Sequence, residues 1–186
     1  MVPSNILMIL FSLSEIGLLI FRRSKRGVSK TQKDRRSLIS FWIVIPLSLT
    51  AGAFAGGYGI WAFGERTVWI TTGIIVFIIG FAIRWTAIIQ LGKMFTVDVA
   101  IDKTHQLKNS GLYKVVRHPS YSGLLLIITG IAISMYSLAS CLILIVPVFA
   151  ALHYRIKVEE EALESEFKSQ YTTYKRSTSR LIPGVY

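Results

Sequence analysis

Residues 121–154 read YSGLLLIITGIAISMYSLASCLILIVPVFAALHY, an apolar run that contains no Asp, Glu, Lys or Arg. A membrane-spanning helix needs about 20 residues, so this run is too long for a single crossing. The small and polar residues near Tyr136–Ser140 offer a place for a tight turn. The run therefore predicts two short membrane helices that form a hairpin.

Three further apolar runs precede this hairpin, at about Asn5–Phe21, Leu38–Phe63 and Val68–Leu91. The chain of 186 residues is 52% hydrophobic and only 17% charged, whereas a soluble domain usually carries about 25% charged residues. Its mean hydropathy is +0.53. We therefore expect an all-α integral membrane protein with about five transmembrane helices.

The Lys and Arg residues, which give a net charge of +11, gather between and after the apolar runs. Most of them fall in the segments 22–36, 92–120 and 155–186. By the positive-inside rule these segments face the cytoplasm, so we expect a multi-pass protein with its N-terminus outside and its C-terminus cytoplasmic. A basic membrane face accounts for the net charge, and no nucleic-acid partner is expected.

The glycines, the single cysteine and the three histidines give expectations about helix packing, disulfides and metal sites. The second apolar run contains four glycines whose spacing favours close helix contact in lipid: Gly52, Gly56, Gly57 and Gly59. Cys141 is the only cysteine and lies inside an apolar run, and the three histidines lack the spacing of metal ligands. Neither an internal disulfide nor a metal site is expected.

The segment 111–123, GLYKVVRHPSYSG, lies where the hairpin begins. Pro119 suits the first turn of a helix, where a missing N–H costs nothing, and it pushes the preceding residue into an extended form. Tyr113 and His118 should therefore lie on irregular backbone at the cytoplasmic mouth of the fourth helix. An interfacial loop with two tyrosines and no chemistry explains the same pattern equally well.

Where the hairpin leaves the membrane, Arg155 and Glu159 are four residues apart and would share one face of a helix. Apolar residues recur at helical spacing through 155–175: Ile156, Leu163, Phe167, Tyr171 and Tyr174. A surface ion pair worth under about 1 kcal/mol is one interpretation of Arg155 and Glu159. Ionisable groups at the edge of a membrane bundle are otherwise candidates for function.

These motifs together resemble the isoprenylcysteine carboxyl methyltransferase family. The resemblance consists of Arg117-His-Pro-Ser-Tyr-Ser-Gly123, a helical hairpin, and then Arg155-x-x-x-Glu-Glu-Glu161. Further matching residues lie on both sides: Arg84, Leu91, Gly92, Phe95, Phe167, Tyr171, Tyr174 and Pro183. The resemblance covers roughly 80–186, so it implies two N-terminal helices with a basic loop (1–66) and a methyltransferase core (67–186).

The resemblance implies S-adenosylmethionine as cofactor, in a cytoplasmic pocket formed by the 92–120 loop and the C-terminal helix. Matched to the family's motifs, the cofactor-binding residues are Asp98, His105, Gln106, Leu107, Lys108, Tyr113, His118, Pro119, Ser120, Tyr121 and Glu159. Lys108 stands where relatives have a small apolar residue, so only its backbone is expected to contribute. Arg155 is expected to bind the carboxylate of the methyl acceptor, and it forms the catalytic pair with Glu159.

The chemistry fits these residue types. Glu159 can receive the cofactor's ammonium group, and Tyr113 and Tyr121 can stack on adenine or attract the sulfonium. A carboxylate acceptor is already ionised and needs a counter-charge such as Arg155 rather than a base. The expected acceptor is an amphipathic or lipid-linked acid reached through the membrane. Two alternatives stay open: a phospholipid or other amine N-methyltransferase with Glu160 or His118 as base, and a non-catalytic membrane protein that retains the fold.

Overall fold

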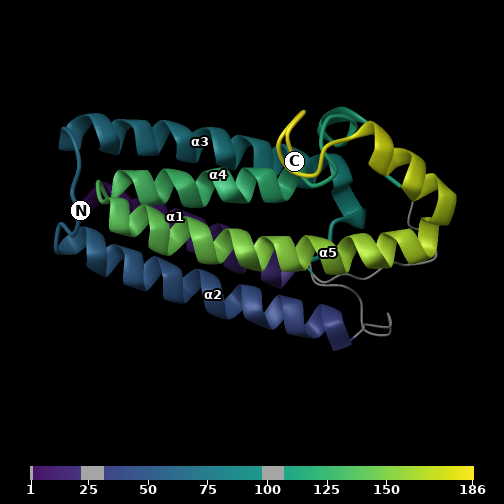
Figure 1. Cartoon of the computed structure of the whole chain (residues 1–186), viewed down its shortest axis with the longest axis horizontal. Coiled ribbons are helices and arrows are strands. Elements are labelled where there is room, and N and C mark those ends of the chain that lie inside the picture. Colours follow the sequence, from purple (N-terminus) through teal and green to yellow (C-terminus); the bar gives the residue numbers. More distant parts are fainter. Residues whose placement is uncertain (1, 22–31, 98–106) are drawn as a thin grey trace.

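The structure, a computed structural model, describes residues 2–21, 32–97 and 107–186. Five α-helices make up most of it: α1 (Val2–Phe21), α2 (Gln32–Gly57), α3 (Arg66–Leu91), α4 (Pro119–Ser134) and α5 (Leu138–Ser177). Two short 3₁₀ turns, η1 (Gly92–Met94) and η2 (Gly111–Lys114), lie between α3 and α4. Successive helices run in opposite directions along one bundle, so the N-terminus and the C-terminal segment lie toward opposite ends (Figure 1).

Four of these helices, α1, α2, α3 and α5, are long and apolar enough to cross a membrane. The fifth, α4, is equally apolar but has 16 residues, about 24 Å against a hydrocarbon core of about 30 Å. The described residues contain isolated bridges but no strand. The predicted all-α, multi-pass integral membrane protein is thereby confirmed, with α4 as a short member of the bundle.

The predicted hairpin is also confirmed, with its turn at Met135–Ser137. The Ser137 hydroxyl accepts a hydrogen bond from the Ser140 N–H (3.1 Å), which caps the start of α5. It also donates to the Ile60 carbonyl, which ties this turn to the connection between α2 and α3. That connection begins earlier than the predicted Phe63, because α2 ends at Gly57 and the backbone then turns through positive φ at Gly59 and Trp61.

Glycine pairs hold α3 against α4. Gly73 faces Gly130 and Gly80 faces Gly123, so the two backbones nearly touch at both places. A Cβ added at Gly130 would lie 2.5 Å from the Phe77 nitrogen, a distance that real Cβ atoms essentially never show. Close approach of this kind is the main source of helix association in lipid, where apolar burial gives no preference for protein over lipid.

The predicted close packing of the second apolar run holds for two of its glycines. Leu144 occupies the space that a side chain at Gly52 would need, and Met135 and Ser140 crowd Gly56 at 3.0 and 3.1 Å. The Ser140 hydroxyl donates to the Gly52 carbonyl (2.8 Å), which fastens α2 to α5. Gly59 serves a different purpose, since its φ of +64° forms the turn and nothing lies within 4 Å of its missing side chain.

Helix α5 continues from the membrane-spanning part through Arg155 to Ser177. Its 40 residues correspond to about 60 Å, roughly twice the thickness of the hydrocarbon core, so its second half must project beyond the bilayer. The predicted helix over 155–175 therefore exists as an extension of α5. It changes direction at Lys168, where φ is 46° and ψ is −118°.

We expect Gly130→Ala to destabilise the protein by about 1–3 kcal/mol, because the added methyl group meets the backbone of α3 and the helices must separate. Thermal unfolding in detergent measures the change. Gly17→Ala on α1 is the matched control, since nothing lies within 4 Å of its added methyl group. Equal stability of both variants would show that the glycine contact does not hold the helices together.

Candidate active site

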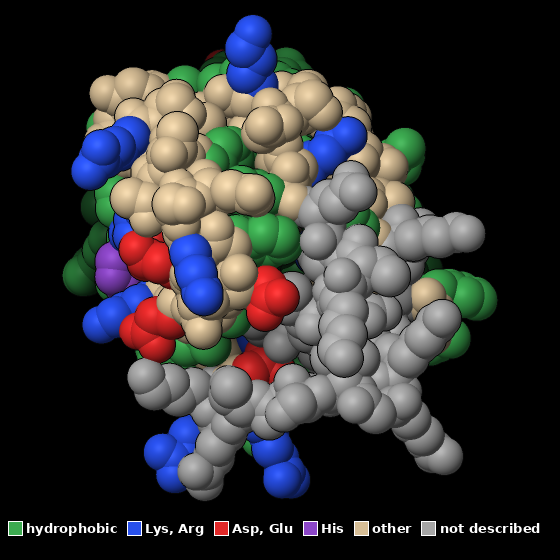
Figure 2. Space-filling view, turned by 90° about the vertical axis from the view of Figure 1, so that its right-hand side faces the viewer, with side chains coloured by type: hydrophobic (Ala, Val, Ile, Leu, Met, Phe, Trp, Pro, Cys, Tyr) green, Lys and Arg blue, Asp and Glu red, His purple; other side chains and the backbone are tan. Residues whose placement is uncertain are grey.

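Four segments meet at the end of the bundle opposite the N-terminus: residues 107–118, the start of α4, the projecting half of α5 and residues 178–186 (Figure 1). Figure 2 looks onto this end and shows Asp and Glu side chains grouped among Lys and Arg side chains. Charged side chains of both signs thus gather at this end of the molecule.

The start of α4 has the predicted form. His118 directly precedes the helix with φ −124° and ψ 59°, and Pro119 is the first helical residue. The Tyr121 and Ser122 N–H groups both donate to the His118 carbonyl at 3.0 Å. Because His118 is only 4% exposed, its imidazole is held inside the protein and does not lie on a loose interfacial loop.

Tyr121 and Glu159 form the centre of the site. The Tyr121 hydroxyl donates to Glu159 Oε2 at 2.8 Å, and its ring stacks on His118 with 5.7 Å between ring centroids. Tyr121 also lines a small cavity together with Arg155. Glu159 also lies 3.9 Å from His118 Nδ1 and keeps 29% of its side chain exposed. Its carboxylate is therefore oriented by the protein but still accessible.

Arg155 is not the surface ion pair with Glu159 that the spacing allowed. It is only 3% exposed, and its guanidinium binds the Asp34 carboxylate of α2. Nη1 also donates to Ser37 Oγ (2.9 Å) and Nη2 to the Val97 carbonyl (2.8 Å). Asp34 was not among the predicted site residues, although it is the one acid inside the basic segment 22–36.

A second buried arginine lies next to it. Arg84 on α3 forms two hydrogen bonds with the Glu15 carboxylate of α1, at 2.9 and 2.8 Å. Its Nη1 donates to the Ser120 carbonyl at 3.0 Å, which fixes the first turn of α4. Sequence reasoning missed Glu15, although it is the one charged residue in the first apolar run. An acid in such a run indicates a buried partner or a functional site.

A small cavity of about 40 Å³ separates the two arginines. Glu15, Arg84, Tyr121 and Arg155 form its polar wall, and its apolar wall includes Trp42. The space can hold one or two water molecules, or the end of a small polar group. Two guanidinium groups, each paired with an acid, therefore line this space beside Tyr121.

Glu160 has a different environment from its neighbour Glu159. It binds Arg117 Nε at 3.0 Å, Arg180 Nη2 at 2.8 Å and His118 Nε2 at 3.3 Å. Burial alone would lower the pKa of Arg180, but its hydrogen bonds with Glu160 and Tyr186 outweigh this and raise the pKa. Glu160 is consequently a structural anchor, with its oxygens already engaged by donors.

The residues after α5 complete this anchor. The Arg117 N–H donates to the Ser179 carbonyl at 2.8 Å, and the His118 N–H donates to the Arg180 carbonyl at 3.2 Å. Ser122 Oγ donates to the Leu181 carbonyl at 2.6 Å. The returning segment 178–186 therefore holds the backbone just before Pro119 and the Ser122 side chain just after it.

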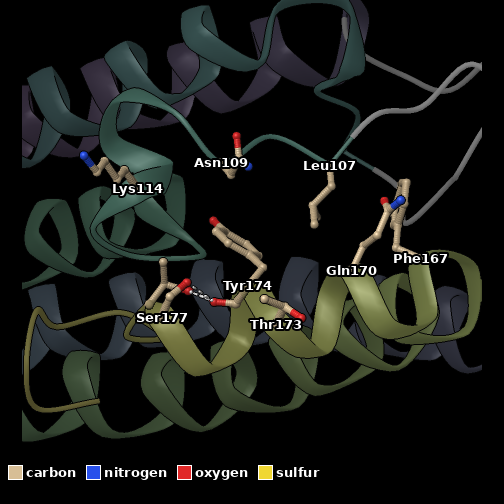
Figure 3. A pocket seen from close by; sticks show the side chains of 9 residues that line it. Leu107, Asn109, Lys114, Phe167, Gln170, Thr173, Tyr174 and Ser177 are labelled. Carbon is tan, nitrogen blue, oxygen red and sulfur yellow. Dashed lines mark hydrogen bonds between the residues drawn. The ribbon is translucent and has the colours of Figure 1, made fainter.

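A larger cavity of about 680 Å³ opens between residues 107–114 and the last turns of α5 (Figure 3). Its wall includes Leu107 and Asn109 on one side and Phe167, Gln170 and Tyr174 on the other. The cavity lies between the two segments predicted to form the cofactor pocket, the 92–120 loop and the C-terminal helix.

Tyr113 and Tyr174 connect this cavity to the Tyr121–Glu159 pair. The Tyr174 hydroxyl donates to the Tyr113 carbonyl at 2.6 Å. Burial, together with the nearby charge of Glu159, raises the pKa of the Tyr113 phenol, which therefore stays neutral.

The structure brings part of the predicted cofactor set together. The start of α4 provides His118, Pro119, Ser120 and Tyr121, and Glu159 of α5 binds Tyr121 there. The charge of Glu159 also acts on the Tyr113 phenol. Leu107 lines the larger cavity, whereas the half-buried Lys108 does not. Asp98, His105 and Gln106 lie outside the described residues.

Comparison with known proteins agrees with this arrangement. The sequence model of the isoprenylcysteine carboxyl methyltransferase (ICMT) family matches residues 73–165, which include α4, Arg155 and Glu159. The fold thus defines a class of protein, a helical membrane bundle with a polar site at one end. The chain belongs to the isoprenylcysteine carboxyl methyltransferase family.

Individual relatives carry the same name. Protein-S-isoprenylcysteine O-methyltransferase B of Arabidopsis thaliana is 33% identical over 120 residues, 63% of this chain and 61% of the relative. The protein-S-isoprenylcysteine O-methyltransferase of Schizosaccharomyces pombe is 30% identical over 121 residues, 64% of this chain and 51% of the relative. The chain thus covers less than two thirds of the length of these relatives.

A solved structure shares the fold. It is that of the eukaryotic intramembrane Ras methyltransferase, isoprenylcysteine carboxyl methyltransferase. The TM-score is 0.66 at 24% identity, and the match covers 96% of this chain and 64% of that one. Because the match includes nearly the whole chain, the first two helices also belong to the shared architecture.

We expect Glu15→Gln to destabilise the protein by about 3–5 kcal/mol, because it leaves the Arg84 cation buried without its counter-charge. Glu164→Gln is the control: the ion pair of Glu164 with Lys175 is largely exposed, so its loss should cost under about 1 kcal/mol. Unfolding by denaturant in detergent micelles measures both. A similar small loss in the two variants would contradict the assigned role of the buried pair.

Proposed function

We propose that this protein is an S-adenosylmethionine-dependent methyltransferase that methylates the carboxylate of an isoprenylcysteine or a similar amphipathic acid at the membrane. One observation carries the proposal. The Tyr121 hydroxyl donates to the accessible carboxylate of Glu159, and Tyr121 lines a small cavity together with the buried guanidinium of Arg155, so a cationic donor and an anionic acceptor would be bound next to each other.

The larger cavity fits the cofactor in size, and the Glu159 carboxylate fits it in charge. The larger cavity, about 680 Å³, is within the range of about 300–1,000 Å³ that is usual for small-molecule sites. Leu107 and Tyr174 give it apolar and aromatic walls suited to adenine. Glu159 keeps part of its carboxylate exposed and would bind the ammonium group. Asp98, His105 and Gln106 remain proposed contacts on the strength of the family resemblance.

S-adenosylmethionine, when bound, supplies a methyl group on a positively charged sulfur. Tyr113 and Tyr121 would direct their ring faces toward that charge and exclude water. Arg155 would hold the acceptor carboxylate, which enters the small cavity between Arg155 and Arg84. Since a carboxylate is already ionised near neutral pH, none of these residues has to remove a proton.

The state of Glu160 and His118 favours this reaction over transfer to an amine. An amine acceptor must lose a proton, and Glu160 and His118 were the two candidate bases. Glu160 is engaged by Arg117, Arg180 and His118, and His118 is buried. A carboxylate fixed by two guanidinium groups is a poor proton acceptor. The amine reaction therefore has less support from the geometry.

The membrane placement follows the same proposal. The site lies at the end of the bundle where the basic segments are attached, so the positive-inside rule puts it on the cytoplasmic side, with the N-terminus outside. A lipid-linked acceptor would enter sideways from the bilayer while its carboxylate reaches Arg155. Incubation with methyl-labelled S-adenosylmethionine and either a prenylcysteine acid or phosphatidylethanolamine tests the proposal. Label in the acid supports it, and label in the amine alone, or in neither, contradicts it.

We expect Glu159→Gln to weaken binding of S-adenosylhomocysteine about tenfold or more, because the ammonium group loses its counter-charge. Isothermal titration in detergent measures the affinity. Glu166→Gln, an exposed position on the same helix, should bind as the parent protein does. An unchanged affinity in Glu159→Gln would remove this residue from the cofactor site.

We expect Arg155→Lys to lower kcat/KM for the acid acceptor about 10–100-fold with little change in S-adenosylhomocysteine affinity. Lysine keeps a charge beside Asp34 but lacks the planar fork that grips a carboxylate. Initial rates against acceptor concentration, together with a cofactor titration, separate the two effects. Equal losses of cofactor affinity and acceptor turnover would count against the acceptor role.

A further inference from the structure

The end of the bundle that carries the N-terminus has a hollow of its own. Its volume is about 310 Å³, and its wall is built from α1, α2, α3 and the turn between α4 and α5. These elements lie at the end of the molecule opposite the candidate active site (Figure 1). The hollow is therefore separate from the proposed methyltransferase site, and a ligand bound in it would be independent of the proposed function.

Glycines create this space. Gly56, Gly57 and Gly59 all line the hollow, at the end of α2 and in the turn after it. No atom lies within 4 Å of the position where a Cβ of Gly59 would be, so the volume beside it is open. The end of α2 and the turn after it therefore form one wall of the hollow.

A single cation borders the hollow. Arg66, at the start of α3, is the only Lys or Arg between Leu38 and Ile83, and its side chain is exposed. Within the described part of the chain it forms no ion pair, even with its neighbour Glu65. Ser4 and Asn5 of α1 and Tyr58 after α2 add polar groups to the same wall. Arg66, Asn5 and Tyr58 together offer a positive charge and hydrogen-bond donors to one anionic group.

Aromatic residues indicate the depth of this end in the membrane. Tyr58 and Trp61 are 72% and 65% exposed, and Trp69 and Tyr136 lie in the same region through their contacts with Phe63. Tyr and Trp concentrate where lipid headgroups meet the hydrocarbon. We therefore expect Arg66 and the hollow to lie at the level of lipid phosphates.

An apolar groove continues from the hollow along α1. Its lining consists of Asn5, Met8, Ile9, Ser12 and Leu13, which share one helical face. Asn5 lines both the hollow and the groove. A molecule with its polar group in the hollow could thus lay a hydrocarbon chain along α1 into the bilayer.

We propose that this hollow and groove bind one glycerophospholipid, with its phosphate against Arg66 and an acyl chain along α1. Arginine suits phosphate because its fork donates two hydrogen bonds to one group. A phosphate also explains the position of an exposed guanidinium that has no acidic partner among the described residues. Binding would join α1 to the start of α3 and to the end of α2 at this face of the membrane.

Titration of the purified protein in detergent with dioleoylphosphatidylglycerol, with native mass spectrometry and thermal unfolding as readouts, tests the proposal. We expect one saturable lipid per protein and a rise in melting temperature. Dioleoylglycerol, which has the same chains but no phosphate, should bind at least about tenfold more weakly.

Two variants and one control sharpen the test. Arg66→Gln removes the phosphate partner and Ser12→Phe fills the groove, and each should raise the apparent Kd about tenfold or more. Arg176→Gln, an exposed arginine beyond the membrane at the other end, should bind as the parent protein does. Both site positions are exposed, so the variants should fold. Non-saturable binding, equal binding of dioleoylglycerol, or equal loss in Arg176→Gln would overturn the proposal.

Discussion

A buried charge needs an opposite charge beside it, and this constraint organises the site end of the molecule. Arg84 is paired with Glu15 and Arg155 with Asp34, so each of these two arginines is held by an acid from one of the first two helices. Glu160 is paired with Arg117 and Arg180. These contacts join all five helices and the returning C-terminal segment around the start of α4.

These ion pairs also separate the ionisable groups that only anchor the structure from those that remain accessible to a ligand. Arg84 and Glu160 are engaged with backbone or charged partners and act as anchors, while Glu159 keeps part of its carboxylate accessible. Tyr121 donates to that carboxylate and lines the small cavity that Arg155 also borders. Because contacts from several helices fix the start of α4, it can hold the methyl donor and the methyl acceptor in line. Methyl transfer by displacement requires this alignment. The glycine contacts between α3 and α4 make the same alignment rigid from within the membrane.

Local patterns in the sequence predicted the positions of most helices and the start of α4. Hydropathy located the helices and the hairpin turn, and Pro119 marked the start of α4, because both effects act over a few neighbouring residues. The partners of the arginines could not be predicted in this way. Asp34 is 121 residues from Arg155 and Glu15 is 69 residues from Arg84, so only the packing of distant helices reveals these contacts. The glycine pairs Gly73–Gly130 and Gly80–Gly123 were missed for the same reason. The division into residues 1–66 and 67–186 stays a prediction.

We propose that a cationic one-carbon donor binds beside Tyr121 and Glu159, at the end of the bundle opposite the N-terminus. An experimental structure with S-adenosylhomocysteine tests it most directly. We expect the ammonium group within hydrogen-bond distance of the Glu159 carboxylate and the adenine between Leu107 and Tyr174. A nucleoside bound elsewhere, with Glu159 and Tyr121 not in contact with it, would contradict the account.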